Sequence, residues 1–91
     1  MLDMTVIILT KDEEHNIVRC INSVKPLAKR IVVVDSYSQD NTVELAKSLG
    51  ADVYQHPFKH YGAQFQYALD HTDINTKWVF RLDADEEVSE E

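Results

Sequence analysis

The sequence predicts an α/β domain with a mainly parallel sheet of about four strands and helices on both faces. Apolar runs occur at residues 4–9, 30–35 and 78–82, the first two rich in β-branched residues, a pattern typical of strands buried on both faces. Segments with apolar residues at helical spacing separate these runs. Ninety-one residues suffice for one domain. Right-handed crossovers then predict the strand order 3-2-1-4.

The first strand, residues 4–9, leads directly into polar residues and a helix. Thr10 and Glu13 have the spacing of a capping box, and Asp12 is an alternative N-cap. Apolar residues then recur at helical spacing, and Pro26 predicts the end of this helix. The apolar residues of this first helix are Ile17, Val18, Ile21 and Val24.

The second strand, residues 30–35, is followed by turn and cap residues at 36–41. Val43, Ala46 and Leu49 predict the inward face of a second helix, and Gly50 is placed as its C′ residue. Residues 52–55 form a short third strand, which we expect near an edge because it is brief and mixed in polarity.

The third helix follows a connection that contains Pro57. Tyr61, Phe65, Ala68 and Leu69 fit one face of this helix and are expected to point inward. Residues 72–77 form a polar loop that leads into the last strand, residues 78–82, which the pattern predicts to be buried. The order is therefore β-α-β-α-β-α-β, without an internal repeat or linker.

Composition excludes several classes of protein. The net charge of −7 argues against a long phosphate backbone as partner. Cys20 is the only cysteine, so the chain cannot form an internal disulfide or a cysteine zinc site. Its two glycines do not make a G-x-G-x-x-G turn or a Walker loop, and no G-x-S-x-G elbow is present. No signal peptide or apolar run of about 18 residues occurs, which predicts a soluble, cytoplasmic chain.

His56 and His60 are four residues apart, a spacing that binds zinc when both lie on one helix face. Pro57 lies between them and interrupts a continuous helical face. We therefore interpret both as loop histidines.

Polar residues follow three of the predicted strands, at residues 10–13, 35–38 and 83–87. In the order 3-2-1-4 these strands are neighbours, so their loops meet at one edge of the sheet. Singly, each group has an ordinary explanation as a cap, a turn or an acidic tail. Together they predict a ligand site.

The residue types indicate what such a site binds. Asp35 can accept the N–H of a uracil ring. One of Asp83 and Asp85 can bind the ribose hydroxyls or metal-bound water, and the other can coordinate the metal itself. Mg²⁺ or Mn²⁺ prefers such oxygen ligands and would bridge the two phosphates of a nucleoside diphosphate.

Three segments resemble the family 2 glycosyltransferases, and the resemblance covers nearly the whole chain. Residues 6–17, VIILTKDEEHNI, are similar to the opening strand and its N-E-x-x-N-I continuation, with Asp12 in place of Asn. Residues 33–42, VVDSYSQDNT, resemble V-V-D-D/S-G-S-T-D-x-T, and residues 81–86, RLDADE, resemble the L-D-A-D-E segment. The second and third segments are most similar to the lipopolysaccharide-core glucosyltransferase-like branch.

The resemblance implies a three-layer, Rossmann-like GT-A half-domain over residues 1–91 that binds a nucleotide-diphosphate sugar, with UDP as the expected nucleotide. It assigns Thr10, Glu13, Asp35 and Asp83 to the nucleotide. It assigns Asp83 and Asp85 to a divalent metal, Mg²⁺ or Mn²⁺. The family generally inverts configuration with a carboxylate base on a later segment, so the general base is expected beyond Glu91.

The same resemblance implies a cell-envelope glycan or lipid as acceptor in lipopolysaccharide biosynthesis. The full-length protein is then cytoplasmic or lies at the inner face of the membrane. Because the acceptor-binding part is expected to be absent from this chain, we expect donor binding with little or no transfer. An incomplete domain that exposes a sheet edge is also expected to self-associate.

The chain departs from the family pattern at three positions. Tyr37 stands where the family has Gly, which predicts a different turn or a crowded site. Phe65 and Gln66 replace a basic residue and Asn, which leaves the diphosphate without that cation. Arg81 either compensates for this loss or pairs with Asp35.

Two alternatives remain open. One is a non-catalytic, receiver-like binding or interaction module with Asp35 as phosphoacceptor, although receiver acids cluster after the first strand. The other is a metal-dependent nucleotidyltransferase, which normally has a Gly-rich, basic loop where this chain has residues 10–13, TKDE.

Overall fold

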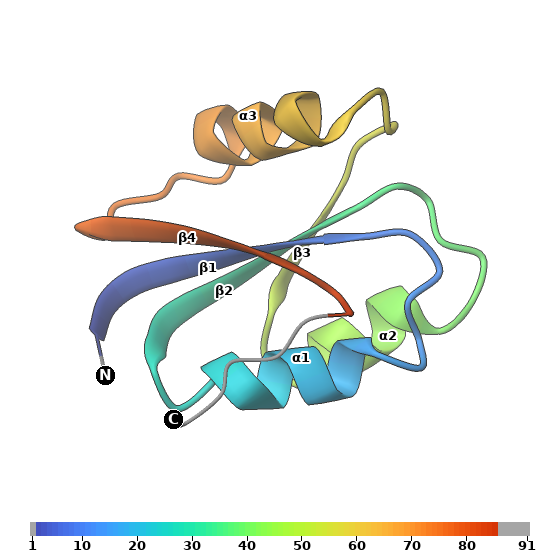
Figure 1. The fold of residues 1–91 in the computed structure, drawn as a ribbon, viewed down its shortest axis with the longest axis horizontal. Helices are drawn as coiled ribbons and strands as arrows, with labels where there is room; N and C mark the ends of the chain where they lie inside the picture. The colour runs from blue at the N-terminus through green and yellow to red at the C-terminus, as the bar shows by residue number, and fades with distance from the viewer. Residues whose placement is uncertain (1, 86–91) are drawn as a thin grey trace.

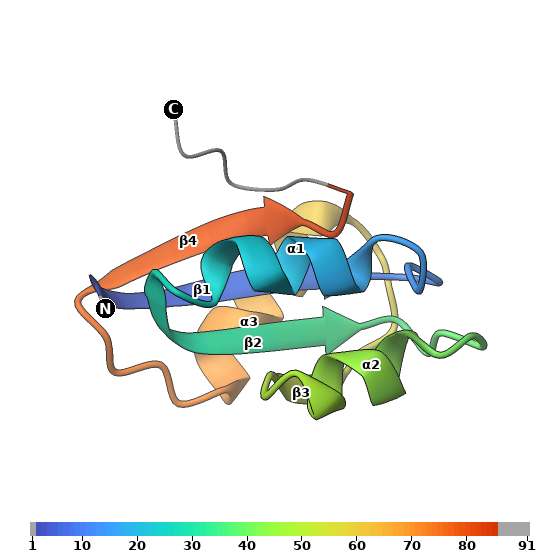
Figure 2. The ribbon, with the colours of Figure 1, turned by 90° about the horizontal axis from the view of Figure 1, so that it is seen from below.

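The computed structural model describes residues 2–85, which form a four-stranded parallel sheet in the order β3-β2-β1-β4 (Figure 1). Helices α1 and α2 cover one face of the sheet and α3 covers the other, as Figures 1 and 2 show from two directions. The predicted three-layer α/β fold and its strand order are confirmed.

Two predictions lie outside the described residues. One concerns the acids that follow Asp85, which belong to residues 86–91. The other is the general base, which we expect beyond Glu91, the last residue of the chain. The structure describes no residue after Asp85, so both stay predictions.

The four strands are parallel and nearly in register at their carboxyl ends. Thr10 pairs with Asp35 on one side of β1, Leu9 pairs with Asp83 on the other, and Asp35 pairs with Gln55. The loops that follow the strands therefore start at the same edge of the sheet. The strands are β1 (Leu2–Thr10), β2 (Ala28–Asp35), β3 (Asp52–Gln55) and β4 (Trp78–Asp83).

The central strands are buried on both faces, which explains their continuous apolar runs. In β1, Val6 and Ile8 belong to the core beneath α1 and α2, whereas Ile7 and Leu9 belong to the core beneath α3. The α1 side is the larger core. The helices are α1 (Ile17–Val24), α2 (Thr42–Ser48) and α3 (Tyr61–His71).

The prediction for the start of α1 was wrong. Thr10 is the last residue of β1, and its hydroxyl donates to Asp35 instead of capping a helix. A loop over residues 11–16 intervenes, and α1 begins at Ile17 with Asn16 as the N-cap residue. Helix α2 forms where predicted, with Ala46 buried and Leu49 packed against the core, but Leu45 packs there in place of the predicted Val43. Gly50 follows the end of the helix at φ +91°, as predicted, a conformation that glycine adopts without a Cβ penalty.

The inward face of α3 also differs from the prediction. Gln64 and Ala68, four residues apart, are its buried residues, whereas Tyr61 is 58% exposed and Leu69 is 38% exposed. His60 caps the helix, since its Nδ1 accepts a hydrogen bond of 3.1 Å from the N–H of Ala63. The helix is thus rotated from the orientation that its apolar residues alone predict.

The last strand is less buried than its apolar sequence predicts. Because β4 is an edge strand, it has a neighbour on one side only among the described residues. Leu82 is buried in the core beneath α1, but Trp78 is 62% exposed and Phe80 is 53% exposed. Among residues 2–85, no helix is long and apolar enough to cross a membrane.

Candidate functional site

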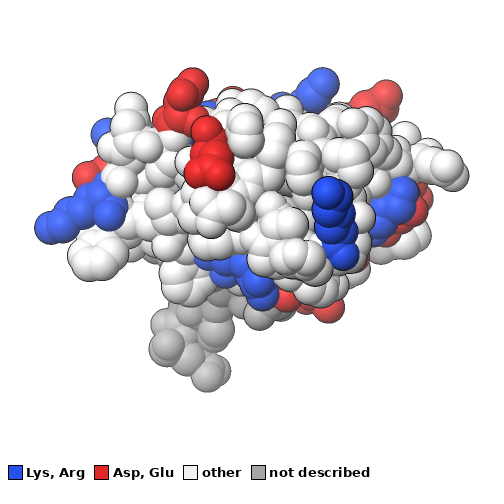
Figure 3. Space-filling model, turned by 90° about the horizontal axis from the view of Figure 1, so that it is seen from above, with Lys and Arg blue, Asp and Glu red and all other residues white. Residues whose placement is uncertain are grey.

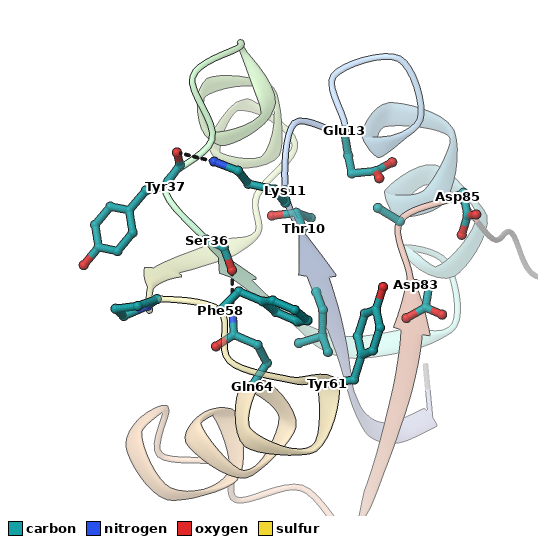
Figure 4. Close-up of a pocket in the computed structure, with 13 residues that line it drawn as sticks. Thr10, Lys11, Glu13, Ser36, Tyr37, Phe58, Tyr61, Gln64, Asp83 and Asp85 are labelled. Carbon is teal, nitrogen blue, oxygen red and sulfur yellow. Dashed lines mark hydrogen bonds between the residues drawn. The ribbon is translucent and has the colours of Figure 1, made fainter.

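A cavity of about 670 Å³ lies at the carboxyl edge of the sheet (Figure 4). Residues from the β1–α1 loop, the end of β2, the β3–α3 connection and the end of β4 line it together. The predicted convergence of the strand ends is therefore seen in the structure. Its lining residues are Leu9, Thr10, Lys11, Glu13, Ser36, Tyr37, Pro57, Phe58, Tyr61, Gln64, Asp83, Ala84 and Asp85.

Of the predicted site residues, Asp35 lies beneath the cavity and is fully buried. Its Oδ1 accepts hydrogen bonds from the hydroxyls of Thr10, at 2.6 Å, and Ser38, at 2.5 Å. Its Oδ2 accepts from the backbone N–H of Ser38 at 2.8 Å. A carboxylate offers about four acceptor positions, so these bonds occupy most of them. Asp35 holds the end of β1 and the loop after β2 in place.

Two loops on this side, residues 11–16 and 36–42, are joined by side chain to backbone hydrogen bonds, and we call them the clasp loops. The N–H of Asp12 donates to Ser38 Oγ at 2.7 Å, and Asp12 Oδ1 accepts from the N–H of Gln39 at 2.8 Å. The N–H of Glu13 donates to Thr42 Oγ1 at 2.8 Å. Each loop therefore satisfies backbone groups of the other.

Asp40 extends this network at the start of α2. Its Oδ1 accepts from both the backbone N–H, at 2.9 Å, and the hydroxyl of Thr42, and its Oδ2 accepts from the N–H of Glu14 at 3.1 Å. Burial raises the pKa of the Asp40 carboxyl, but the hydrogen bonds from Thr42 and Glu14 more than offset this, and the pKa lies below its ordinary value. The ionised carboxylate is the form that the clasp loops need.

Glu13 lines the cavity and is half-buried. Its Oε2 accepts from Asn16 Nδ2 at 3.1 Å, which fixes the carboxylate against the start of α1. Glu13 was predicted to belong to a capping box, but in the structure its carboxylate is held by this hydrogen bond from Asn16. The carboxylate lies at the rim between Thr10 and Asp85 (Figure 4).

Tyr37 does not crowd the cavity. Its backbone has φ +54°, in the left-handed region that favours glycine. Its N–H donates to Gln55 Oε1 at 2.9 Å, and its carbonyl accepts from Lys11 Nζ at 3.0 Å. Tyr37 is 57% exposed, and its ring points away from the centre of the cavity (Figure 4). The change from Gly is therefore accommodated by backbone strain and not by blocking the site.

The two acids at the end of β4 reach the cavity through a turn. The strand ends at Asp83, and residues 84–85 turn, so the backbone is not extended through Asp85. Ala84 is 3% exposed and anchors the turn, while the Asp85 side chain is exposed. We call residues 83–85 the acid turn. Both carboxylates line the cavity on the side opposite Ser36 and Tyr37 (Figure 4).

These two carboxylates suit a hard divalent cation. Oxygen ligands are what Mg²⁺ and Mn²⁺ prefer, and such ions are usually bound through one or two carboxylates together with phosphates and water. Over residues 2–85, no group of three or more His, Cys, Asp or Glu residues could form a cage of protein ligands. The donor set therefore fits a metal that arrives with a phosphorylated ligand.

Arg81 lies beside the acid turn. Its Nη2 is 3.9 Å from Asp83 Oδ1, and its guanidinium lies 5.8 Å from the centre of the Tyr61 ring. Both contacts are on exposed side chains, where ion pairs contribute little to stability. Within residues 2–85, Arg81 therefore pairs with Asp83 and not with Asp35, whose carboxylate bonds to Thr10 and Ser38. Its predicted role as a substitute cation stays a prediction.

Sequence reasoning missed the side of the cavity that comes from the β3–α3 connection. Phe58 and Tyr61 pack edge to face, with ring centres 5.2 Å apart, and both residues are more than half exposed. Gln64, which is 1% exposed, lies beneath them. The sequence offered one indication that Gln64 is buried, because it lies four positions before Ala68 and so on the same face of the helix. Figure 3, the view onto the α3 side, shows charged side chains of both signs scattered over a mostly uncharged surface.

His56 and His60, which we interpreted as loop histidines, make contacts that hold the loop and the helix together. His56 Nδ1 lies 2.6 Å from Gln64 Oε1, and its ring stacks on Tyr67 with centres 4.1 Å apart. His60 caps α3. The two residues therefore hold the β3–α3 connection against the helix.

Curated relatives resemble the chain over its whole length. It is 44% identical to an uncharacterized glycosyltransferase of Rickettsia typhi over all of this chain and 30% of that protein. It is 35% identical to the lipopolysaccharide core biosynthesis glycosyltransferase LpsC of Rhizobium meliloti over 93% of this chain and 32% of that protein. The chain thus spans about a third of the length of these relatives.

Solved structures support the same relationship. Glucosyl-3-phosphoglycerate synthase from Mycobacterium tuberculosis in complex with UDP superimposes with a TM-score of 0.78 at 25% identity, covering 91% of this chain and 34% of that one. The same enzyme with Mn²⁺, UDP and glucosyl-3-phosphoglycerate gives a TM-score of 0.76 at 25% identity, covering 89% and 33%. The sequence profile described as Glycosyl transferase family 2 matches residues 5–91. The chain belongs to glycosyl transferase family 2, and its described residues form a GT-A half-domain of that family.

Proposed function

We propose that this chain is the donor-binding part of an inverting glycosyltransferase that takes a sugar from a UDP-linked donor. The observation that carries the proposal is the cavity at the carboxyl edge, where Thr10 and Glu13 face Asp83 and Asp85 across one space. The UDP and Mn²⁺ in the structural relatives support the same assignment.

Each residue has a distinct place in the proposed site. Thr10 and Glu13 form the nucleoside end, and Asp35 acts from beneath by holding Thr10. Asp83 and Asp85 would hold the metal, Mg²⁺ or Mn²⁺, and Asp83 would also face the nucleotide. When bound, the metal neutralises the diphosphate and stabilises the nucleoside diphosphate as it leaves. Arg81, beside Asp83, supplies positive charge in place of the basic residue that Phe65 replaces.

We further propose that residues 1–91 form the donor-binding unit, without the acceptor-binding part, and that the general base lies beyond Glu91. The curated relatives are about three times as long, since the chain covers 30% of the first. A base must lie within hydrogen-bond reach of the acceptor hydroxyl. By itself, the chain is then expected to bind the donor and to transfer little or no sugar.

The acceptor is proposed to be a cell-envelope glycan or lipid, with the protein in the cytoplasm or at the inner face of the membrane. Similarity to a lipopolysaccharide core glycosyltransferase supports this. Self-association of the isolated chain is also proposed, because the edge strand β4 exposes Trp78 and Phe80. Sedimentation at increasing protein concentration tests it, and a monomer at every concentration would refute it.

Titration of the chain with UDP and UDP-glucose, with and without Mn²⁺, tests the donor-binding role. Isothermal calorimetry gives the affinity, and NMR shifts of Thr10, Asp35 and Asp83 locate the ligand. We expect binding that requires the metal and shifts around the cavity. The Asp3→Asn variant, altered at an exposed position of β1 away from the cavity, is the matched control.

The alternatives give different results in the same titration. A nucleotidyltransferase would prefer UTP over UDP and UDP-glucose. A non-catalytic interaction module would bind none of them, and a receiver-like module would instead be modified at Asp35 by a small phosphodonor. Either pattern would replace the proposed function.

A further inference from the structure

Arg81 is placed beside the acid turn by the alternation of side chains along β4. Successive side chains of a strand point to opposite faces of the sheet, so residues two apart share a face. Leu82 belongs to the core beneath α1, and Val79 packs against the core beneath α3. Arg81 and Asp83 therefore both lie on the α3 face, one after the other along the strand. This shared face explains why the guanidinium meets the first carboxylate of the acid turn.

The ion pair between Arg81 and Asp83 is shielded but loose. Asp83 Oδ1 is buried, although the side chain as a whole is 40% exposed. Arg81 Nη2 lies 3.9 Å from this oxygen, a distance longer than a hydrogen bond. Opposite charges attract more strongly where water is excluded, so the guanidinium neutralises Asp83 without being fixed to it. The Arg81 side chain is itself 42% exposed and can turn.

The ring of Tyr61 offers the guanidinium a second contact. Arg81 Cζ lies 5.8 Å from the centre of that ring, within the range of a cation–π interaction. Phe58 packs edge to face on the same ring, with centres 5.2 Å apart, and Tyr61 lines the cavity beside Asp83 (Figure 4). Arg81 therefore lies at the border of the cavity, between a carboxylate and an aromatic face.

The cavity has an excess of negative charge, which a diphosphate would increase. Its described lining includes one cation, Lys11, and three acidic residues, Glu13, Asp83 and Asp85. Lys11 Nζ donates to a backbone carbonyl at 3.0 Å on the side opposite the acid turn (Figure 4). Within residues 2–85, Arg81 is the cation that contacts the acid turn. Its charge therefore acts on both the carboxylates and any phosphate beside them.

We propose that Arg81 is an exchangeable counter-ion that couples the binding of the divalent metal to that of the nucleotide. In the nucleotide-free chain its guanidinium neutralises Asp83 and so opposes the binding of another cation at the acid turn. When a nucleoside diphosphate enters, the guanidinium turns along the Tyr61 ring to a phosphate oxygen, for which its planar fork is suited, and releases Asp83. This inference rests on the proposed function and adds a coupling between its two ligands.

Arg81→Gln should change two affinities in opposite directions. Without nucleotide, the variant lacks the competing charge, so the affinity for Mn²⁺ alone should rise about threefold, the effect of one exposed ion pair. With saturating Mn²⁺, the loss of a charge-assisted contact should weaken UDP binding about tenfold. Paramagnetic broadening of the Asp83 and Asp85 amide signals in NMR measures the first affinity, and calorimetry measures the second.

Lys29→Gln is the matched control, because it removes one positive charge at an exposed position of β2 outside the cavity lining. Neither affinity should change in this variant. Arg81→Lys keeps the charge but not the planar fork, so the affinity for Mn²⁺ alone should stay unaltered while UDP binding weakens several-fold.

Two variants of Tyr61 test the aromatic contact. Tyr61→Leu removes the ring and should weaken UDP binding about threefold in Mn²⁺. Tyr61→Phe keeps the ring and should retain the affinity of the unaltered chain. Equal losses in the two variants would overturn the role of the ring.

The outcomes separate this inference from the proposed function. If UDP binds in Mn²⁺ but the affinity for Mn²⁺ alone is unchanged or lower in Arg81→Gln, the competition at Asp83 is overturned. UDP binding that is unchanged or stronger in that variant would overturn the contact with the phosphates. A folded, unaltered chain that binds Mn²⁺ but not UDP would refute the proposed function and, with it, the coupling.

Discussion

The two sides of the cavity are held in different ways. The clasp loops are joined by hydrogen bonds that satisfy backbone groups of both loops, and buried Asp35 fixes them from below. The acid turn on the opposite side rests on buried Ala84 and presents Asp85 to solvent. This difference teaches that one side is organised before a ligand binds, while the other keeps its charge accessible for a metal. Substitutions should therefore affect stability on one side and binding on the other.

The largest expected effect is the loss of metal-dependent binding in Asp85→Asn. An amide is a much weaker ligand for Mg²⁺ or Mn²⁺ than a carboxylate, so UDP affinity in Mn²⁺ should fall about 100-fold. Since Asp85 is exposed, the free energy of unfolding should change by less than about 0.5 kcal/mol. Calorimetry and urea denaturation measure the two quantities. Retained affinity would remove Asp85 from the proposed metal site.

Asp35→Asn tests the organised side. The amide nitrogen of Asn cannot accept the hydrogen bonds that reach both carboxylate oxygens from Thr10 and Ser38. We expect the free energy of unfolding to fall by about 2 kcal/mol, measured by urea denaturation. Asp52→Asn is the control, since it disrupts only the ion pair with Arg30, a pair expected to contribute less than about 1 kcal/mol. Equal losses of stability in the two variants would contradict the role of Asp35 in holding the clasp loops.

The stability of the clasp loops should depend on pH through Asp40. Because the pKa of Asp40 is lowered in the folded chain, its ionised form adds stability above the ordinary aspartate pKa of about 3.9. This contribution is lost as the pH falls through the lowered value. The difference in unfolding free energy between the unaltered chain and Asp40→Asn should therefore shrink from pH 6 to about pH 2. Urea titrations at both pH values measure it, and a constant difference would be the contrary result.

The smallest expected effect is that of Tyr37→Gly. Glycine removes the cost of a φ of +54° but gains entropy in the unfolded chain, so the net stabilisation should be about 0.5 kcal/mol. UDP affinity should not change, because the ring points away from the cavity. Thermal unfolding and calorimetry check both statements. A weaker affinity would show that the ring reaches the ligand.

The sheet and the meeting of its loops could be predicted because they follow from local patterns. Continuous β-branched runs identify central strands, and parallel order brings strand ends such as Thr10 and Asp35 to one edge. The exposure of Trp78 could not be predicted in the same way. An apolar run looks alike in a central strand and an edge strand, and the packing of the helices on the two faces decides which residues of β4 are covered.

The site residues were harder to predict where their partners are distant in sequence. Thr10 and Glu13 have helix-cap spacing, yet Thr10 bonds to Asp35, 25 positions away. Gln64 was missed because a polar residue is ordinarily assigned to the outer face of a helix. It is buried because Ser36 and His56 satisfy its amide, and that compensation is a tertiary contact.

The residues that line the cavity, among those the structure describes, all fall between Leu9 and Asp85. Parallel strands bring these described residues together from one continuous part of the chain. Under the proposed function, the preference for a nucleotide is therefore encoded in one uninterrupted stretch. Such a stretch behaves as a cassette: exchanged as a block between family members, it would carry its base preference into a new enzyme.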